Sequence, residues 1–538
     1  MKNNKTILGI SLVLIMVLFA SLPLFGKGYI PTHDGEYHII RFIEFFRMLS
    51  AGYWFPRWAP TLNSGYGIPI FSFHYPLPNY IGAFFQGIGF DAVMAFKLSL
   101  ALGYISAGIF SFLWLRKLFG VKAGIVGSVV SSFVPYWFVD LFVRGSVGEV
   151  WAIAFMFAAL VFCEYGLLIP FSFVIAGLIL SHNILAMLFL PFLLGLTLIR
   201  NKRFIIGYLF GLLLSAYFWI PAILERSNVV GLNTVNFREH FVQLYELVIP
   251  SWGTALSGAT FGGDKMSFQV GIIPLILIIG SLIFGLKEKN VGNRKIYWFV
   301  FSFFILSIYF MLPLSIVFWE YAPMLSFVQY PWRFLSFIIP ITAFMAAYIS
   351  YHIRARIVSI GLIVISVVIV YSYTRPVIYA PRDSVYYLSR ENFTDGTSSM
   401  GNSFSTRWTS WKSKRPEYLL EVINGQITGD FPKNNYLEKK FAVTTENGAD
   451  VHVPILYYPG WSVILDQKES VINYQKDGTI RFAVSQGTHD VIVSFRETTT
   501  RKIADIFSII TLVWLVGWGI LEVYAYSIKH SIFNRRTH

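Results

Sequence analysis

Charged residues are scarce in this sequence of 538 residues. They make up only 13% of the chain, against 55% hydrophobic residues, and the mean hydropathy is +0.59. A soluble domain usually carries about 25% charged residues, so this composition excludes an ordinary soluble fold. It predicts a polytopic α-helical membrane protein.

Cysteine is nearly absent, because Cys163 is the only one in the chain. A lone thiol excludes a disulfide within the chain and any cluster of cysteine metal ligands. The ten histidines show no paired metal-ligand spacing on a predicted strand. We therefore also reject a zinc site of the three-histidine kind.

The net charge of +14 at first suggests a protein that binds nucleic acid. The basic residues, however, lie mostly in short gaps between apolar runs, where the positive-inside rule explains them. Nucleic acid is therefore excluded as a partner, and the composition predicts the lipid bilayer instead.

Apolar runs long enough to cross a bilayer core of about 30 Å recur along the chain. We count twelve of them. They fall near residues 6–25, 93–114, 121–138, 150–165, 167–181, 184–199, 204–223, 268–286, 296–313, 333–351, 356–373 and 503–526. The three runs between 150 and 199 are separated by short gaps, and one of them could be re-entrant.

The basic gaps between these runs all fall on one side of the membrane if the chain starts inside. They hold Arg116, Lys117, Lys122, Arg200, Lys202, Arg203, Lys287, Lys289, Arg294, Lys295, Arg354 and Arg356, and the C-terminal segment adds Lys529, Arg535 and Arg536. This regularity predicts a plasma-membrane protein with both termini in the cytoplasm. The segments that are then extracytoplasmic are 26–92, 139–149, 225–267, 314–332 and 374–502.

Residues 374–502 are too polar and too long for a loop, so we expect a folded extracytoplasmic domain there. Short runs rich in β-branched or aromatic residues lie at 418–423, 440–443, 451–457, 461–465, 480–484 and 490–495. Strands of this length and spacing predict a small antiparallel β-sandwich. The chain thus divides into a transmembrane domain at 1–373, the β-rich domain at 374–502, and a final helix with a basic cytoplasmic tail at 503–538.

The first external loop carries the most informative side chains. After Asp34, apolar and charged residues interleave as in an amphipathic helix that ends near Ala51. In that helix Asp34 and His38 share one face, which places a carboxylate beside an imidazole. The alternative is that Asp34 only caps the helix. Residues 52–80 are too rich in Gly, Pro and aromatic residues for one helix, so we expect a fixed, folded loop.

Several motifs together resemble a known family of prokaryotic membrane proteins. They are Asp34 with His38, Gly52…Pro56-x-Trp58, Gly65-Tyr66-Gly67-x-Pro69, Tyr75-Pro76-Leu77, Arg144-Gly145-x-x-x-Glu149, Ser181-His182-Asn183, Phe218-Trp219-Ile220-Pro221 and Gln329-Tyr330-Pro331-Trp332-Arg333-Phe334. The family is labelled "6-pyruvoyl-tetrahydropterin synthase-related" and is grouped with the GT-C type glycosyltransferases. The β-rich domain, with Tyr458-Pro459-Gly460-Trp461, is similar to that of YfhO-like membrane glycosyltransferases.

This resemblance implies a GT-C-like fold and a sugar transfer at the cell envelope. A hexosyl or pentosyl group would move, with inversion, from a polyprenyl-phosphate donor to an extracytoplasmic glycan, lipid or protein acceptor. Enzymes of this class use an acidic residue of the first external loop, a position that Asp34 matches, and Glu36 is the second candidate for the base. No cofactor is certain, and either carboxylate could instead bind a divalent metal ion.

A departing phosphate requires cations, and Arg144 and Arg333 lie at external helix ends flanked by apolar sequence. For Arg144 the alternative is an ion pair with Asp140 or Glu149. For Arg333 it is snorkelling to the interface. The substrate-binding residues that we expect are His38, Arg57, Tyr75, Arg144, Glu149, His182, Gln329 and Arg333. A backbone carbonyl could equally satisfy the imidazole of His182.

Two other functions remain open. A transporter or flippase for lipid-linked envelope glycans predicts two related halves, or interrupted helices with charges inside the membrane, and the sequence displays neither clearly. A non-catalytic assembly factor would keep the fold without needing Asp34.

Overall fold

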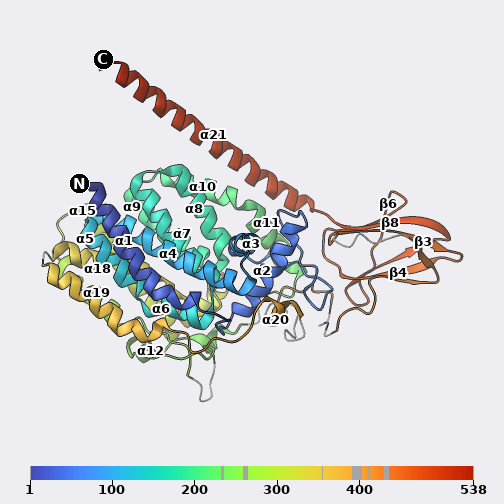
Figure 1. Ribbon diagram of the computed structural model, residues 1–538, viewed down its shortest axis with the longest axis horizontal. Helices are drawn as coiled ribbons and strands as arrows, with labels where there is room; N and C mark the ends of the chain where they lie inside the picture. Colours follow the sequence, from blue (N-terminus) through green and yellow to red (C-terminus); the bar gives the residue numbers. More distant parts are fainter. Residues whose placement is uncertain are drawn as a thin grey trace.

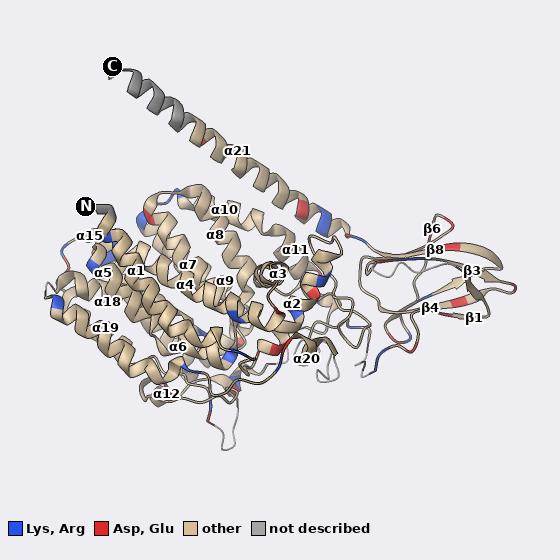
Figure 2. Cartoon of the chain, in the orientation of Figure 1, with Lys and Arg blue, Asp and Glu red and all other residues tan. Residues whose placement is uncertain are grey.

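A bundle of helices with a β region beside it makes up the chain (Figure 1). The computed structural model describes residues 2–231, 235–258, 264–353, 355–389, 403–409, 412, 414–428 and 435–536. Figure 2 shows that the helices of the bundle are largely free of charge along their length, and that Lys and Arg lie mostly near helix ends and in loops. This is the charge distribution of an integral, multi-pass membrane protein.

Helices of different lengths build the bundle, and others lie in its connections. The bundle helices are α1 (Lys2–Ser21), α4 (Ala92–Phe119), α5 (Val121–Ser132), α7 (Val147–Tyr165), α8 (Leu168–Ser181), α9 (Asn183–Arg200), α10 (Phe204–Leu214), α11 (Ala216–Leu224), α13 (Ile272–Gly280), α15 (Val291–Met311), α18 (Ile338–His352), α19 (Arg356–Val370) and α21 (Thr499–Arg536). The shorter or connecting helices are α2 (Gly35–Ser50), α3 (Leu77–Gly87), α6 (Pro135–Phe138), α12 (Leu244–Val248), α14 (Leu282–Gly285), α16 (Ile316–Tyr321), α17 (Pro323–Ser326) and α20 (Ser384–Ser389).

The described part of the chain holds eight helices that are long and apolar enough to cross a membrane, or up to ten spans if each of two bent pairs is one span. The bent pairs are Val121–Ser132 with Pro135–Arg144 (49°) and Phe204–Leu214 with Ala216–Leu224 (66°). The expected twelve spans are therefore not reached. The runs 167–181 and 268–286 form the shorter helices Leu168–Ser181 and Ile272–Gly285. A helix of 14 residues, such as α8, is only about 21 Å long, which is less than the apolar core of a bilayer.

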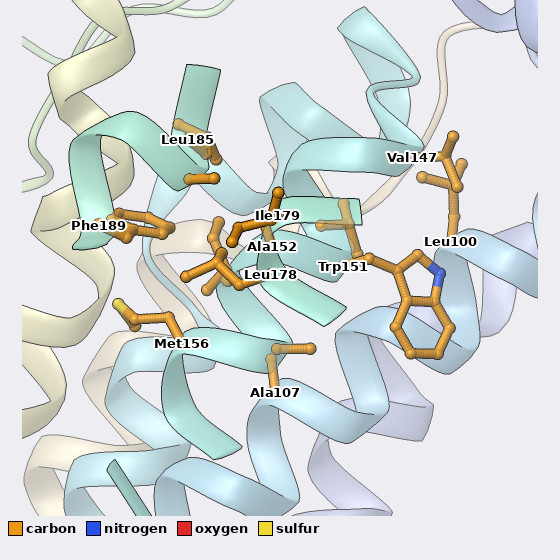
Figure 3. Close-up of a cluster of buried hydrophobic side chains, with 14 of the residues drawn as sticks. Leu100, Ala107, Val147, Trp151, Ala152, Met156, Leu178, Ile179, Leu185 and Phe189 are labelled. Atoms are coloured by element: carbon orange, nitrogen blue, oxygen red, sulfur yellow. The ribbon is translucent and has the colours of Figure 1, made fainter. Parts of the chain in front are cut away.

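Part of the hydrophobic core of the bundle lies where α4, α7, α8 and α9 meet. Figure 3 shows side chains that contribute to this core; those labelled are Leu100, Ala107, Val147, Trp151, Ala152, Met156, Leu178, Ile179, Leu185 and Phe189. Small residues let α4 and α7 approach closely, because a Cβ added at Gly103 would lie 2.8 Å from the Val150 side chain. Close packing of this kind holds helices together where lipid removes the hydrophobic driving force.

Two antiparallel sheets form the β region. The smaller has the strand order β1-β4-β7 and the larger β2-β3-β8-β5-β6. Their bounds are β1 (Glu421–Ile423), β2 (Gln426–Thr428), β3 (Glu438–Thr445), β4 (Ala449–Leu456), β5 (Trp461–Leu465), β6 (Lys468–Ser470), β7 (Thr479–Val484) and β8 (Gly487–Phe495). The antiparallel region and all six strands expected from the sequence are confirmed, and β2 and β6 are additional. Residues 390–402 of the expected domain lie outside the described residues.

The first loop, residues 26–92, is a packed structure rather than a tether. Its helix α2 begins directly after Asp34, as expected, and the sequence did not predict α3. Between these helices the chain turns at Gly67, whose φ of +81° favours glycine. A Cβ added there would lie 2.5 Å from the indole nitrogen of Trp58, so this turn has no room for a larger residue.

A buried ion pair joins the β region and α21 to the bundle. Arg501, near the start of α21, donates from Nη2 and Nε to Glu225 Oε2 at 2.8 and 3.1 Å. Tyr458, which precedes β5, donates to the same oxygen at 2.8 Å. Arg501 is fully buried, and a buried charge is tolerated only with such a partner. The β region is thereby anchored next to α11.

The orientation of the chain can be tested with an impermeant maleimide in a Cys163→Ala background, which removes the one native thiol. We expect labelling of Val471→Cys in intact cells, and of Lys289→Cys only after permeabilisation. Both positions are exposed, and the positive-inside rule places them on opposite sides of the membrane. The reverse pattern would invert the topology, and with it the side on which Asp34 lies.

Candidate active site

Arg144 ends a π-helical turn, Val139–Arg144, inside the first bent helix pair. Turns of this kind occur frequently at functional sites. Gly145 follows with a φ of +66° and a ψ of +34°, a left-handed conformation that favours glycine. The chain then enters α7, whose first turn carries Glu149. This tight reversal brings Arg144 and Glu149 into contact.

A buried network of charges surrounds Arg144. Its Nη2 donates to Glu149 Oε1 at 2.7 Å, and its Nη1 donates to Asp140 Oδ1 at 2.6 Å. Tyr136 donates to Glu149 Oε2 at 3.0 Å. The guanidinium of Arg144 also lies 4.7 Å from the ring centroid of Trp332. The ion pair that was the alternative interpretation of Arg144 is therefore present, with both of its expected partners.

Arg333 reaches the same carboxylate from a distant part of the chain. Its Nε donates to Glu149 Oε1 at 3.3 Å, and its Nη1 donates to Val328 O at 2.7 Å and to Gln329 Oε1 at 2.9 Å. Because Arg333 is only 7% exposed, the snorkelling interpretation is wrong. Gln329 has a φ of +66°, which is uncommon for a residue other than glycine and is typical of functional sites.

We name these residues the Glu149 cluster, which consists of Tyr136, Asp140, Arg144, Glu149, His182 and Arg333. His182 Nε2 lies 3.9 Å from Glu149 Oε1, and its Nδ1 accepts the backbone N–H of Leu185 at 3.1 Å. The backbone partner of His182 is thus an amide, not the carbonyl considered from the sequence. The two carboxylates of the cluster balance its two guanidiniums, and all four groups are buried.

The backbone before α2 is bonded to the turn that carries Arg144. His33 N donates to Val143 O at 3.0 Å, and Asp34 N donates to Arg144 O at 2.8 Å. The Asp34 side chain makes no cap hydrogen bond, and it forms no hydrogen bond or ion pair with a described residue. Asp34 thus occupies the N-cap position of α2, as the alternative interpretation required, but its side chain does not cap the helix. Its carboxylate is half-buried and available to a ligand.

Tyr75 packs against the histidines of the site. Its ring centroid lies 4.0 Å from that of His74 and 4.9 Å from that of His182. Burial raises the pKa of Tyr75; the carboxylates of Asp34 and Glu149 raise it further, and nearby arginines oppose them. Tyr75 is therefore within electrostatic reach of both carboxylates, and connects Asp34 with the Glu149 cluster.

His38 and His74 are buried beside a cation. Arg41 Nη1 donates to His74 Nε2 at 2.8 Å, and the rings of His38 and His74 are 5.7 Å apart. Burial lowers the pKa of both imidazoles well below the ordinary value, and the Arg41 guanidinium lowers it further. Both imidazoles are therefore neutral at neutral pH.

Glu36 and Arg57, which the sequence also suggested, lie outside the Glu149 cluster. Glu36 forms an ion pair with Arg382. Arg57 donates to Asp505 at 2.9 Å and to Glu497 at 3.2 Å, so it binds the start of α21. In the described part of the chain, no group of three or more His, Cys, Asp or Glu side chains could hold a metal ion.

Sequence reasoning missed Arg41, His74, Tyr136 and Trp332. Arg41 alternates with apolar residues in α2, so its pattern is that of a solvent-facing side chain. His74 lies within the aromatic-rich loop 52–80, and Trp332 lies within the motif Gln329–Phe334. Both regions were singled out from the sequence, so these two residues could have been identified from it. Tyr136 lies in an apolar run, where nothing distinguishes it from neighbouring aromatic residues.

The sequence of residues 71–377 matches the family described as the 6-pyruvoyl-tetrahydropterin synthase related domain, a membrane protein. The match covers more than half of the chain and includes Tyr75 and the whole Glu149 cluster, and it begins after Asp34. An uncharacterized protein of Lactococcus lactis subsp. cremoris (strain MG1363) is 23% identical over 337 residues, which are 56% of this chain and 52% of that protein. The chain thus spans about half the length of the curated relative that it matches.

Two solved structures are similar to this one. The arabinofuranosyltransferase AftD from Mycobacteria gives a TM-score of 0.43 at 13% identity, over 70% of this chain and 26% of that chain. ArnT from Cupriavidus metallidurans, solved with bound undecaprenyl phosphate, gives a TM-score of 0.40 at 15% identity, over 68% of this chain and 63% of that chain.

The neutral histidines predict a loss of stability in acid. A histidine whose pKa is lower in the folded protein than in the unfolded chain takes up its proton first in the unfolded chain. Its contribution to the free energy of unfolding is therefore complete above about pH 6.5 and falls by about 1.4 kcal/mol for each pH unit below that value. We expect the melting temperature of the detergent-solubilised protein to fall between pH 7 and pH 5, and to fall less in His38→Phe. Phenylalanine suits the site because the His38 ring stacks on Phe96.

The control for this experiment is His489→Asn. His489 is paired with Asp466, which raises the pKa of the imidazole. Its ion pair therefore stabilises the folded protein more as the pH falls, and its removal should not reduce the loss of stability in acid. Equal pH dependence in the wild type and His38→Phe would show that His38 is not the acid-sensitive group.

Proposed function

We propose that this chain, which belongs to the 6-pyruvoyl-tetrahydropterin synthase related family of membrane proteins, is a glycosyltransferase. It moves a sugar from a polyprenyl-phosphate donor to an extracytoplasmic acceptor in the assembly of a cell-envelope glycan. The observation that carries the proposal is the position of Asp34. Its backbone N–H donates to the Arg144 carbonyl at 2.8 Å, while its carboxylate forms no hydrogen bond or ion pair with a described residue.

The reaction requires a base on one side of the anomeric carbon and cations on the other. The acceptor hydroxyl oxygen forms a bond to the anomeric carbon, and the bond from that carbon to the phosphate oxygen breaks. The hydroxyl proton goes to the Asp34 carboxylate. The electron pair of the broken bond goes to the phosphate, whose charge changes from about −1 to about −2. Attack opposite the leaving group inverts the configuration.

Arg144 and Arg333 stabilise the charge that develops on the phosphate. A guanidinium has five N–H donors, and each of these two makes three hydrogen bonds with described residues. Two N–H groups of each arginine (five minus three) therefore remain for a ligand. Glu149 and Asp140 hold the guanidiniums in place, and such fixed donors need no reorganisation when the charge appears.

Further polar side chains position the substrates. His38 follows the base by one turn of α2, and Tyr75 packs against His74 and His182. His182 and Gln329 lie next to the phosphate-binding arginines. Glu36 serves the site indirectly. Its ion pair with Arg382 holds the first turn of α2, so Asp34 and not Glu36 is the proposed base.

Transport of a lipid-linked glycan is a second candidate that a specific observation favours. The sequence did not clearly predict interrupted helices with charges inside the membrane, yet the structure has two bent pairs, and one of them carries Asp140 and Arg144. Broken helices with buried charges are typical of transporters. The transferase is preferred because the available carboxylate of Asp34, next in the fold to the turn that carries Arg144, supplies the base that glycosyl transfer requires in addition to cations.

Loss of the base should slow transfer without unfolding the protein. We expect Asp34→Asn to lower turnover by about 100-fold or more, measured in proteoliposomes with radiolabelled polyprenyl-phosphate sugars and envelope acceptors. Because the side chain makes no cap bond, its stability should stay within about 0.5 kcal/mol of the wild type.

The matched control is Asp91→Asn. Asp91 does cap a helix, since its side chain accepts from Val93 N and Met94 N, and asparagine keeps that cap. Full transfer by a folded Asp34→Asn variant would refute Asp34 as the base and make Glu36 the next candidate. Movement of the lipid-linked sugar across the bilayer by wild-type protein, with no transfer, would favour the transporter. The absence of both transfer and transport in the wild-type protein would favour the assembly factor.

A further inference from the structure

Three aromatic rings gather where the β region meets the first loop. Tyr457 and Tyr474 stack with their centroids 3.9 Å apart and an interplanar angle of 5°. The ring of Trp408 lies 5.4 Å from Tyr457 and 5.2 Å from Tyr474. We name Trp408, Tyr457 and Tyr474 the aromatic platform. Each of these side chains is partly exposed, so the rings do not form a closed core.

The backbone of the β region holds the platform rigidly. Tyr457 N donates to Gly478 O at 2.7 Å, and Gly478 N donates to Tyr474 O at 2.9 Å. Thr409, next to Trp408, donates from its hydroxyl to Asp477 O at 3.2 Å. The rings therefore keep their arrangement without a ligand, which lowers the entropic cost of binding one.

Hydrogen-bonding side chains border the rings. Asp477 accepts from Arg481 Nη2 at 3.1 Å, and both side chains are partly exposed. Lys412 Nζ lies 5.3 Å from the ring of Tyr66 in the first loop. Arg407, which is exposed, lies over the Trp408 ring at 5.0 Å. The surface thus combines partly exposed aromatic rings with charged side chains around them.

A short segment connects the platform to the candidate active site. Phe404 reaches the histidines of the candidate site, because its ring centroid lies 6.4 Å from that of His74 and 6.0 Å from the Arg41 guanidinium. Trp408 follows four residues later. Four residues of fully extended chain span about 14 Å at most, so the platform lies a short distance from the candidate site.

We propose that the aromatic platform binds the saccharide chain of the acceptor, so that its growing end lies at Asp34. The inference rests on the proposed glycosyl transfer and adds the class of acceptor, an oligosaccharide or polysaccharide. The C–H face of a sugar ring packs on Trp and Tyr faces, and its hydroxyls bond to groups such as Asp477 and Arg481.

The chemistry of the surface favours a saccharide over a lipid. A lipid chain needs a continuous aliphatic surface, whereas the platform consists of rings with polar edges and charged neighbours. Trp and Tyr also offer large contact areas at a small cost in side-chain entropy. The charged side chains at its border, such as Asp477 and Arg481, are partly exposed and offer polar atoms that a lipid chain could not use.

The test measures binding of the full-length protein in nanodiscs to the envelope polysaccharide fraction of its own cells, by biolayer interferometry. We expect Trp408→Ala and Tyr474→Ala each to weaken binding at least tenfold. Trp54→Ala is the matched control, because Trp54 is 71% exposed in the first loop and outside the platform. Melting temperatures verify that each variant is folded, and Trp408→Phe, which keeps a flat ring, should retain most of the binding.

Binding and catalysis are separated by Asp34→Asn, which should bind the polysaccharide as the wild type does. Wild-type protein that binds no more polysaccharide than Trp408→Ala would overturn the platform, whatever the transfer assay gives. Normal binding of the polysaccharide by Trp408→Ala and by Tyr474→Ala would also overturn the platform. Loss of binding in the platform variants together with full transfer by Asp34→Asn would support the platform and refute the proposed base.

Discussion

The pairing of buried charges around Glu149 is the interaction on which the rest of this structure depends. An ionised side chain inside a membrane protein is costly unless an opposite charge accompanies it. Arg144 comes from the π-helical turn, Glu149 from α7, and Arg333 from the turn before α18. Removal of one member of a buried pair typically costs about 3–5 kcal/mol. These segments can therefore pack only in an arrangement that brings their charged residues together.

The irregular backbone near the cluster follows from the same constraint. Non-helical chain at membrane depth is tolerated only where protein covers it, and the turn Val139–Arg144 is buried throughout. Two of its carbonyl groups, those of Val143 and Arg144, accept hydrogen bonds from the first loop, donated by His33 N and Asp34 N. The loop that carries the proposed base is thus held by the backbone of the turn that carries a proposed phosphate ligand. This coupling leaves the Asp34 side chain available for chemistry.

A second buried pair, Glu225 with Arg501, connects the β region to this arrangement. The β region is consequently not a loosely attached module, and its aromatic platform keeps a defined position relative to the first loop. If the platform binds the acceptor glycan, then the acceptor, the base Asp34 and the phosphate-binding arginines are held in fixed positions relative to one another. The bent helices fit either a donor that enters from the bilayer or a transported lipid, and the transfer and transport assays distinguish the two.

The sequence by itself determined the membrane class, the positions of the apolar helices, the antiparallel β region and a short set of polar residues, because composition and periodicity are properties of the chain read locally. The sequence overestimated the number of membrane spans, because apolar runs such as 167–181 form helices that are too short to count as a span. Only the tertiary structure decided that Glu149 joins both arginines, that Asp34 does not cap its helix, and that Arg57 binds α21. Arg333 and Glu149 are 184 residues apart in the chain, and Arg57 and Glu497 are 440 apart. No local pattern records a partner at such a distance, because packing alone brings the two together.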